Sequence, residues 1–234
     1  MTRLLVLRPG QPGADLANQL TTETYTGRHT PSLAVQPIPF SLSEKDYDFV
    51  IFISPTAVNS AQTSLSELCA KAGNVIAVGT GTATELTRQG ISKPLVPSEF
   101  NSEGLLAMPE LQQVKDKHVL VVKGIGGRKL LADTLLERGA ICDLLDVYDR
   151  VSQRISQTDW QWYEAGQRRG VTTASVETLE AFDQQRQSGG YSLPDFILVA
   201  SDRIAETAEA LGYTKVINVG GAANHHFANA LTQQ

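Results

Sequence analysis

The sequence is poor in the residues from which metal sites and disulfide frameworks are built. Its two cysteines, Cys69 and Cys142, lie far apart in the chain and outside any CxxC or Cys/His cluster. We expect two reduced thiols that behave as small hydrophobic side chains. The four histidines include the adjacent pair His225 and His226, which would not share one face of a helix. We therefore predict neither a metal ion nor a disulfide.

Several well-known active-site motifs are also missing. No GxSxG or GxxxxGK(S/T) pattern occurs, and the glycine-rich stretches at 79–84 and 124–128 do not complete a GxGxxG pattern. These gaps weigh against a nucleotide-dependent enzyme, which stays open as a weaker alternative.

Long hydrophobic runs and an excess of positive charge are absent as well. The longest apolar runs, such as 49–53 and 196–200, are far shorter than the ~20 residues that cross a bilayer. The four apolar residues before Arg8 are too few for a signal peptide. The net charge of −5 argues against duplex nucleic acid as the main partner. We expect a cytoplasmic protein without membrane or nucleic-acid partners, and a monomer because no long apolar stretch demands a partner.

Short apolar runs alternate with longer amphipathic segments, which predicts an α/β fold of the flavodoxin-like, doubly wound kind. The expected strands are 4–7, 49–53, 75–78, 118–122, 171–174, 196–200 and 216–219, and the expected helices are 15–20, 56–72, 82–89, 128–138, 177–187 and 203–211. Gly73, Gly90, Gly139 and Gly212 stand where helices should end. Continuously apolar strands are typical of a parallel sheet that is covered on both faces.

The chain also repeats itself. Segment 75–90 resembles 196–212, segment 52–57 resembles 173–177, and segment 5–20 resembles 120–135. These similarities predict two related α/β units and, taken alone, a boundary near residue 115. The stretches 37–39 and 148–154 are the expected linkers.

Small polar residues or glycines follow most of the expected strands, just before a helix begins. They are Ser54, Gly79–Thr82, Gly124–Gly127, Ser175 and Ser201. The carboxyl ends of parallel strands form a binding crevice, and helix N-termini attract anions. We predict an anion-binding cleft shared by the two units; the alternative is that these residues only cap helices. Arg8, Lys123 and Arg128 lie near strand ends and either pair with carboxylates or remain solvated surface charges.

Tyr148 ends an apolar run beside an expected linker. A phenol in that place can donate a proton or a hydrogen bond into a cleft. The alternative is an aromatic ring packed at a hinge.

Taken in order, these motifs make the sequence resemble the uroporphyrinogen-III synthase family over nearly its whole length. The matching segments are 8–9, 52–58, 78–83, 102–106, 124–128, 138–140 and 147–150. The resemblance implies two flavodoxin-like, parallel-sheet α/β domains joined by a two-stranded linker. One domain would comprise 1–36 and 151–234, and the other, 37–150, would be inserted into it.

The resemblance further implies a lyase of porphyrin and heme biosynthesis. Such an enzyme cyclises hydroxymethylbilane, a linear tetrapyrrole with eight carboxylates, to uroporphyrinogen III. Water is lost, and ring D is inverted through a spiro-pyrrolenine intermediate. The resemblance implies that no cofactor or metal is needed. The bilane closes to the non-inverted isomer without an enzyme, so catalysis would consist mainly of positioning the substrate in an interdomain cleft.

The resemblance also implies site residues. Tyr148 matches the tyrosine of the family and is the candidate acid for the departing hydroxyl. Ser54, Thr82 and Ser175 match polar cleft positions of the family. Together with the residues at strand ends, the candidate substrate-binding residues are Arg8, Ser54, Thr82, Gly127, Arg128, Ser175, Ser201 and Arg203. Arg203 stands where some relatives carry threonine, and Thr56 where some carry arginine. The substrate would be received by transient hand-over from the preceding enzyme of the pathway. The alternative function is a cytosolic two-lobe binding module for a small polyanionic ligand.

Overall fold

The computed structural model describes residues 1–127 and 129–232 and divides into two compact units. Unit 1 comprises Met1–Ala34 and Val151–Gln234, and unit 2 comprises Val35–Arg150. The boundary near residue 115 that the repeats predict is wrong, since this position lies inside unit 2. The chain leaves unit 1 and later returns to it, so the halves of the sequence are not the units of the structure. The domain limits that the resemblance implies, 1–36 with 151–234 and 37–150, differ from these units by two residues at the first crossing.

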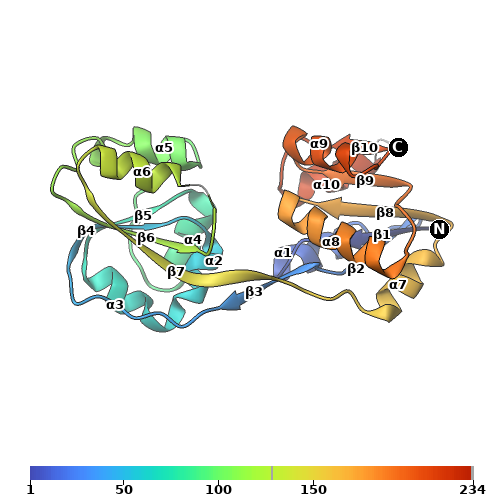
Figure 1. The fold of residues 1–234 in the computed structure, drawn as a ribbon, viewed down its shortest axis with the longest axis horizontal. Coiled ribbons are helices and arrows are strands. Elements are labelled where there is room, and N and C mark those ends of the chain that lie inside the picture. The colour runs from blue at the N-terminus through green and yellow to red at the C-terminus, as the bar shows by residue number, and fades with distance from the viewer. Residues whose placement is uncertain (128, 233–234) are drawn as a thin grey trace. The chain divides into compact units, whose positions relative to one another are not determined.

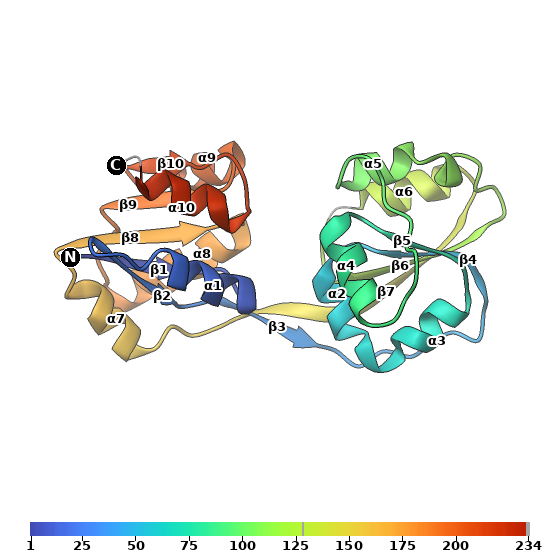
Figure 2. The same cartoon turned by 180° about the vertical axis from the view of Figure 1, so that it is seen from behind.

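Unit 1 is a five-stranded parallel sheet in the order β10-β9-β8-β1-β2. Its elements are β1 (Thr2–Val6), α1 (Gln11–Gln19), β2 (Tyr25–His29), α7 (Gln157–Glu164), β8 (Arg168–Thr173), α8 (Val176–Gly189), β9 (Phe196–Val199), α9 (Asp202–Ala210), β10 (Val216–Asn218) and α10 (Asn224–Thr232). Helices α7 and α8 lie in front of the sheet in Figure 1, and α1 and α10 in front of it in Figure 2. Both faces are thus covered, which explains why the central strands are apolar along their whole length.

Unit 2 contains the second sheet, in the order β3-β7-β6-β4-β5. Its elements are β4 (Tyr47–Phe52), α2 (Pro55–Ser60), η1 (Gln62–Ser64), α3 (Leu65–Ala70), β5 (Ala72–Ala77), α4 (Thr80–Arg88), α5 (Ser102–Ala107), η2 (Pro109–Leu111), β6 (His118–Gly124) and α6 (Leu130–Glu137). Successive strand residues feed two separate cores: Val50 and Phe52 pack toward α2, α3 and α4, whereas Phe49 and Ile51 pack toward α5 and α6. The alternation of side chains along a strand sends each second residue to the opposite core.

Two strands carry the chain across the unit boundary. They are β3 (Leu33–Pro37) and β7 (Ile141–Ser152), which neighbour each other in the sheet. The amide of Ile38 donates to the carbonyl of Val147 (3.1 Å), and the amide of Gln153 donates to the carbonyl of Ser32 (2.9 Å). Residues later in the first strand thus pair with residues earlier in the second, so β3 and β7 are antiparallel. The two-stranded connection is the linker that the resemblance implies.

The two units share one strand order. Numbered along the chain within each unit, β1, β2, β8 and β9 and likewise β4, β5, β6 and β7 lie in the order 2-1-3-4, which is the flavodoxin-like order. The prediction of two similar α/β units is confirmed. The repeats nevertheless pair β4 with β8 and β6 with β1, which do not hold equivalent places in this order. Short strand–turn–helix similarities reflect the common local structure of such segments rather than equivalent positions.

Several predicted boundaries differ from the structure. The helix expected over 56–72 is broken into α2, η1 and α3, with an i→i+3 bond from the Ser64 amide to the Ala61 carbonyl (2.9 Å) at the break. Gly73 is not a helix end: it lies in β5, where a Cβ would come 3.0 Å from the carbonyl oxygen of Asp48. Gly90, Gly139 and Gly212 do end helices, with positive φ angles of 90°, 84° and 91°. Six strands and α-helices were not predicted from the sequence: β2, β3, β7, α5, α7 and α10.

Both cysteines are free and half-buried against core clusters, as predicted. Burial raises the pKa of the Cys69 thiol to about 11. Burial, with a smaller contribution from Asp143, raises the pKa of the Cys142 thiol to about 11. No helix in the described part of the chain is long and apolar enough to span a membrane.

Candidate active site

The carboxyl ends of the strands in unit 2 gather the first group of predicted site residues. Strand β4 ends at Phe52, and the Ser54 side chain then caps α2 by accepting a hydrogen bond from the amide of Ala57 (3.0 Å). Next to it, β5 leads through the extended residue Gly79 into α4. Because these strands are parallel, the helix N-termini that follow them open on the same edge of the sheet.

Tyr148 lies at this edge, on β7, with only 2% of its surface exposed. Its hydroxyl is 3.4 Å from Ser54 Oγ and accepts a hydrogen bond from Arg150 Nη2 at 3.2 Å. The Arg150 guanidinium carbon also lies 5.4 Å from the centre of the Tyr148 ring. Ser54 and Tyr148 are thus two predicted site residues that the structure brings into contact, although 94 positions separate them.

Gly124 makes room for the Tyr148 ring. The two residues are register partners on β6 and β7, directly after an irregularity in the pairing. A Cβ at Gly124 would lie 2.5 Å from Cζ and 2.6 Å from Cε2 of Tyr148, a separation that real Cβ atoms do not show. Neither Gly124 nor Arg150 was predicted to have a separate role. Spacing alone signals Arg150, because residues two apart on a strand share a face.

The loop after β6 continues along the same edge. The Ile125 amide donates to the carbonyl of Tyr148 (2.8 Å), while the Ile125 side chain is exposed. Gly126 and Gly127 follow with φ angles of 77° and 84°, in the left-handed region that favours glycine. Both glycines are exposed, so their amides are accessible to a ligand. Arg128, also predicted to bind substrate, lies outside the described residues.

The side chains of two other predicted residues at this edge contact other parts of the protein. Lys123 pairs with Asp146 on the neighbouring strand (2.7 Å), so its predicted carboxylate partner is an internal one. Thr82 is the third residue of α4 and only 2% exposed, so its side chain faces the interior. The exposed surface at the start of α4 is formed instead by Thr80 and Gly81.

In unit 1 the predicted residues follow β1, β8 and β9. Arg8 comes after β1, and its Nη1 donates to the carbonyl of Ala222 (2.7 Å) and to Asn224 Oδ1 (3.1 Å). Both of these partners are neutral oxygens. Burial lowers the pKa of Arg8, which nevertheless stays a cation because an arginine titrates far above neutrality. The structure therefore places a half-buried positive charge at the carboxyl edge of this sheet.

The remaining predicted residues of unit 1 lie at helix starts. Ser175 caps α8 through the amide of Thr178 (3.2 Å) and also lies 2.7 Å from the Thr178 hydroxyl. Ser201 holds the N-cap position of α9 but makes no side-chain capping bond, and its side chain is exposed. Arg203, in the first turn of α9, is exposed too. The interpretation of these serines as helix caps thus holds for Ser54 and Ser175, and not for the Ser201 side chain.

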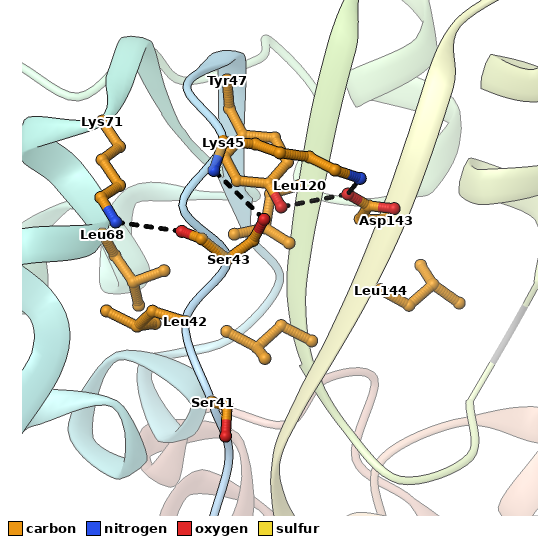
Figure 3. A pocket seen from close by; sticks show the side chains of 11 residues that line it. Ser41, Leu42, Ser43, Lys45, Tyr47, Leu68, Lys71, Leu120, Asp143 and Leu144 are labelled. Carbon is orange, nitrogen blue, oxygen red and sulfur yellow. Dashed lines mark hydrogen bonds and ion pairs between the residues drawn. The ribbon is translucent and has the colours of Figure 1, made fainter.

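A separate pocket of unit 2 lies at the opposite end of the sheet (Figure 3). Its cavity of about 250 Å³ is lined by Tyr47, the first residue of β4. Ser54, in contrast, lies just beyond the last residue of that strand. Asp143 accepts hydrogen bonds from the Tyr47 hydroxyl (3.0 Å) and from Lys45 Nζ (3.2 Å), and Lys71 donates to the carbonyl of Ser43 (3.0 Å). Burial and the bond to Asp143 raise the pKa of Tyr47. The polar groups of this pocket thus pair with one another.

The donors at the carboxyl edges suit an anionic organic ligand. Over residues 1–127 and 129–232, no group of three or more His, Cys, Asp or Glu side chains is arranged to hold a metal ion. The edges provide helix N-termini, exposed loop amides and Arg8, all of which favour carboxylates. Tyr148 adds one phenol that can donate to a bound molecule.

Known proteins match the chain along most of its length. A family model described as "Uroporphyrinogen-III synthase HemD" matches residues 14–219. The chain is 30% identical to the uroporphyrinogen-III synthase of Escherichia coli K12, over 97% of this chain and 99% of that protein. It is 29% identical to the protein of the same name from Salmonella typhimurium, with the same coverage.

Solved structures share the fold at low sequence identity. The uroporphyrinogen-III synthetase of Helicobacter pylori matches with a TM-score of 0.71 at 15% identity, over the whole of both chains. A mutant uroporphyrinogen III synthase of Thermus thermophilus matches with a TM-score of 0.60 at 16% identity, again over both chains completely.

Proposed function

The chain belongs to the uroporphyrinogen-III synthase family, and from this premise we propose that Tyr148 is the acid in the cyclisation of hydroxymethylbilane to uroporphyrinogen III. The reaction releases water and inverts ring D, which makes the enzyme a lyase of porphyrin and heme biosynthesis. The observation that carries the proposal is the position of the Tyr148 hydroxyl at the carboxyl edge of its sheet, between Ser54 Oγ and the Arg150 guanidinium.

The departing hydroxyl of the bilane needs a proton to leave as water. A phenol is protonated at neutral pH and can supply that proton. The guanidinium beside the phenol oxygen stabilises the negative charge that develops there as the proton leaves. Because the bilane also closes without an enzyme to the non-inverted isomer, the acid must act on a substrate that is already folded for the inverted closure.

We propose that donors at the carboxyl edge of each unit's own sheet bind carboxylates of the substrate. The residues assigned to this role are Arg8, Ser54, Thr82, Gly127, Arg128, Ser175, Ser201 and Arg203. The half-buried charge of Arg8, whose hydrogen-bond partners Ala222 and Asn224 contribute neutral oxygens, supports the assignment. Since the Thr82 side chain faces the interior, its part falls to the backbone at the start of α4.

The experiment compares Y148F with the wild-type enzyme on freshly prepared hydroxymethylbilane, with the type I and type III products resolved by chromatography. Loss of a general acid typically costs 10²–10⁴-fold; we expect a type III rate reduced roughly hundredfold, near the low end of this range, because the hydroxyl leaves readily by itself. The Y148F fold should be intact, since the ring that fills the core is kept. Y47F is the matched control: it removes a tyrosine hydroxyl at the other end of the sheet and should keep the type III rate. A full rate in Y148F would remove Tyr148 from the mechanism.

The same assay separates the alternative functions. Binding of the bilane without turnover would support a two-lobe binding module, which the matched relatives do not favour, and dependence on added nucleotide would support a nucleotide-dependent enzyme. We further propose that the enzyme is a cytoplasmic monomer that receives its substrate by transient hand-over from the preceding enzyme. Light scattering of the purified protein, alone and with that enzyme, tests the monomer and the hand-over complex.

A further inference from the structure

We propose that Arg150 is a positioning residue for catalysis, which orients the Tyr148 phenol so that its proton points toward the substrate. The proposal rests on the function proposed for Tyr148 and adds a second residue to it. Arg150 follows Tyr148 by two positions on β7, so both side chains leave the same face of the strand. Its Nη2 lies 3.2 Å from the phenol oxygen, and its guanidinium carbon lies 5.4 Å from the ring centre.

The direction of the phenol proton follows from counting donors around the oxygen. Arg150 can only donate, so the phenol oxygen is the acceptor in that bond. Ser54 Oγ already accepts the Ala57 amide at 3.0 Å, which leaves the serine proton available for the phenol oxygen 3.4 Å away. Either hydroxyl can donate in the Ser54 contact, and the arrangement that we propose is the one in which Ser54 donates as Arg150 does, so that the phenol keeps its own proton free of these partners. That proton is then available to a bound ligand.

Arg150 also bears on the charge balance of the step. The phenol proton passes to the leaving hydroxyl, the carbon–oxygen bond breaks, and water departs. The phenolate that remains lies beside the Arg150 cation, which stabilises it. Ring D attacks the freed methylene carbon through its substituted α-carbon, which carries no hydrogen, and this gives the spiro intermediate. The bond from that carbon to its original bridge then breaks, and the other α-carbon of ring D bonds to the bridge. The proton that this second carbon loses restores the phenol. No oxidant or cofactor enters this balance.

A purely structural role for Arg150 makes a different prediction from a role through Tyr148. A structural role would lower activity whether or not the phenol hydroxyl is present. A role through the hydroxyl disappears when the hydroxyl is removed. A double-mutant cycle of Arg150 and Tyr148 therefore decides between them.

The experiment measures kcat and KM for type III formation in R150M, R150K and R150Q, each in the wild-type and in the Y148F background, together with thermal unfolding. A charge-assisted hydrogen bond of the usual strength predicts a kcat reduced roughly ten- to hundredfold in R150M, with KM within about twofold. R150K, which restores a cationic donor, should recover part of the loss. In the Y148F background, R150M should change kcat by less than about twofold. R88M, which removes an exposed arginine paired with Glu85 on α4, is the matched control and should retain wild-type kcat.

Three results would overturn the inference: an equal loss in the two backgrounds, a loss that falls on KM rather than kcat, or a wild-type kcat in R150M. If R150M fails to unfold cooperatively, R150Q takes its place. Its amide is a neutral donor, so the loss of kcat should be smaller than that expected for R150M, and it should likewise disappear in the Y148F background. A full type III rate in Y148F would instead refute the acid assigned under the proposed function. The result that refutes the role of Arg150 therefore differs from the result that refutes the role of Tyr148.

Discussion

Replacing Gly124 with alanine tests how tightly the fold holds Tyr148. The new methyl group would lie 2.5, 2.6 and 2.9 Å from three carbons of the phenol ring. Gly124 has no positive φ angle, so the substitution introduces a steric conflict and no backbone strain. The ring cannot move aside freely, because Tyr148 is 2% exposed and belongs to the core on the α2, α3 and α4 side of the sheet.

Two ways of relieving the contact differ in free energy. Turning the ring out of the core would expose an aromatic side chain of roughly 150–250 Å², at a cost of about 4–6 kcal/mol. A small displacement of β6 against β7 costs about 1–3 kcal/mol, which is typical of overpacking. Replacing glycine also lowers the entropy of the unfolded chain, which offsets about 0.4–1 kcal/mol. We therefore expect the small displacement, and a net loss of about 1–2 kcal/mol in the free energy of unfolding.

Urea unfolding and the type III rate should both report the change. We expect G124A to be less stable by this amount and slower in forming the type III isomer, because the phenol is displaced from Ser54 and Arg150. G81A is the matched control for the stability measurement: the nearest atom to its new methyl group is 3.9 Å away, and in helix α4 alanine should be neutral or stabilising. In a Tyr148→Ala background the penalty of G124A should vanish. A G124A protein with wild-type stability and rate, or an equal penalty without the ring, would refute the reasoning.

Two further predictions concern groups away from the active site. The hydrogen bonds that Asp48 accepts from Lys117 and from the His118 amide lower the pKa of Asp48 below its ordinary value. Ionised Asp48 therefore stabilises the fold at pH values above the carboxyl pKa of the unfolded chain. This stabilisation is lost as the pH falls through the pKa of Asp48 in the folded protein. In urea unfolding below about pH 5, the stability of D48N should therefore depend less on pH than that of the wild type, and identical pH profiles would contradict the assignment. The thiols of Cys69 and Cys142 have pKa values of about 11, so both should react slowly with a thiol reagent at pH 7.5. They should react rapidly once the protein is unfolded in urea. Fast labelling of the native protein would contradict their burial.

Local features of the fold were predictable because neighbouring residues determine them. Apolar runs such as 49–53 identify strands with two covered faces, and Gly90, Gly139 and Gly212 identify helix ends through a φ angle that other residues rarely adopt. Ser54 and Ser175 identify helix starts, since each hydroxyl reaches an amide three residues ahead. Strands β2 and β7 were missed, because β2 (YTGRH) has no apolar run and Asp143, Asp146 and Asp149 interrupt the apolar run of β7.

The sequence alone therefore determined the α/β class, the existence of two similar units and, through its motifs, the family. Only the tertiary structure decided that the Tyr148 ring rests on Gly124, that Lys123 is already paired with Asp146, and that Arg8 binds groups more than 200 positions away. These contacts depend on strand order and register, which bring together residues that no local pattern relates. The repeats also did not predict where one unit ends and the other begins. The chain leaves unit 1 and later returns to it, and no local sequence pattern marks these crossings.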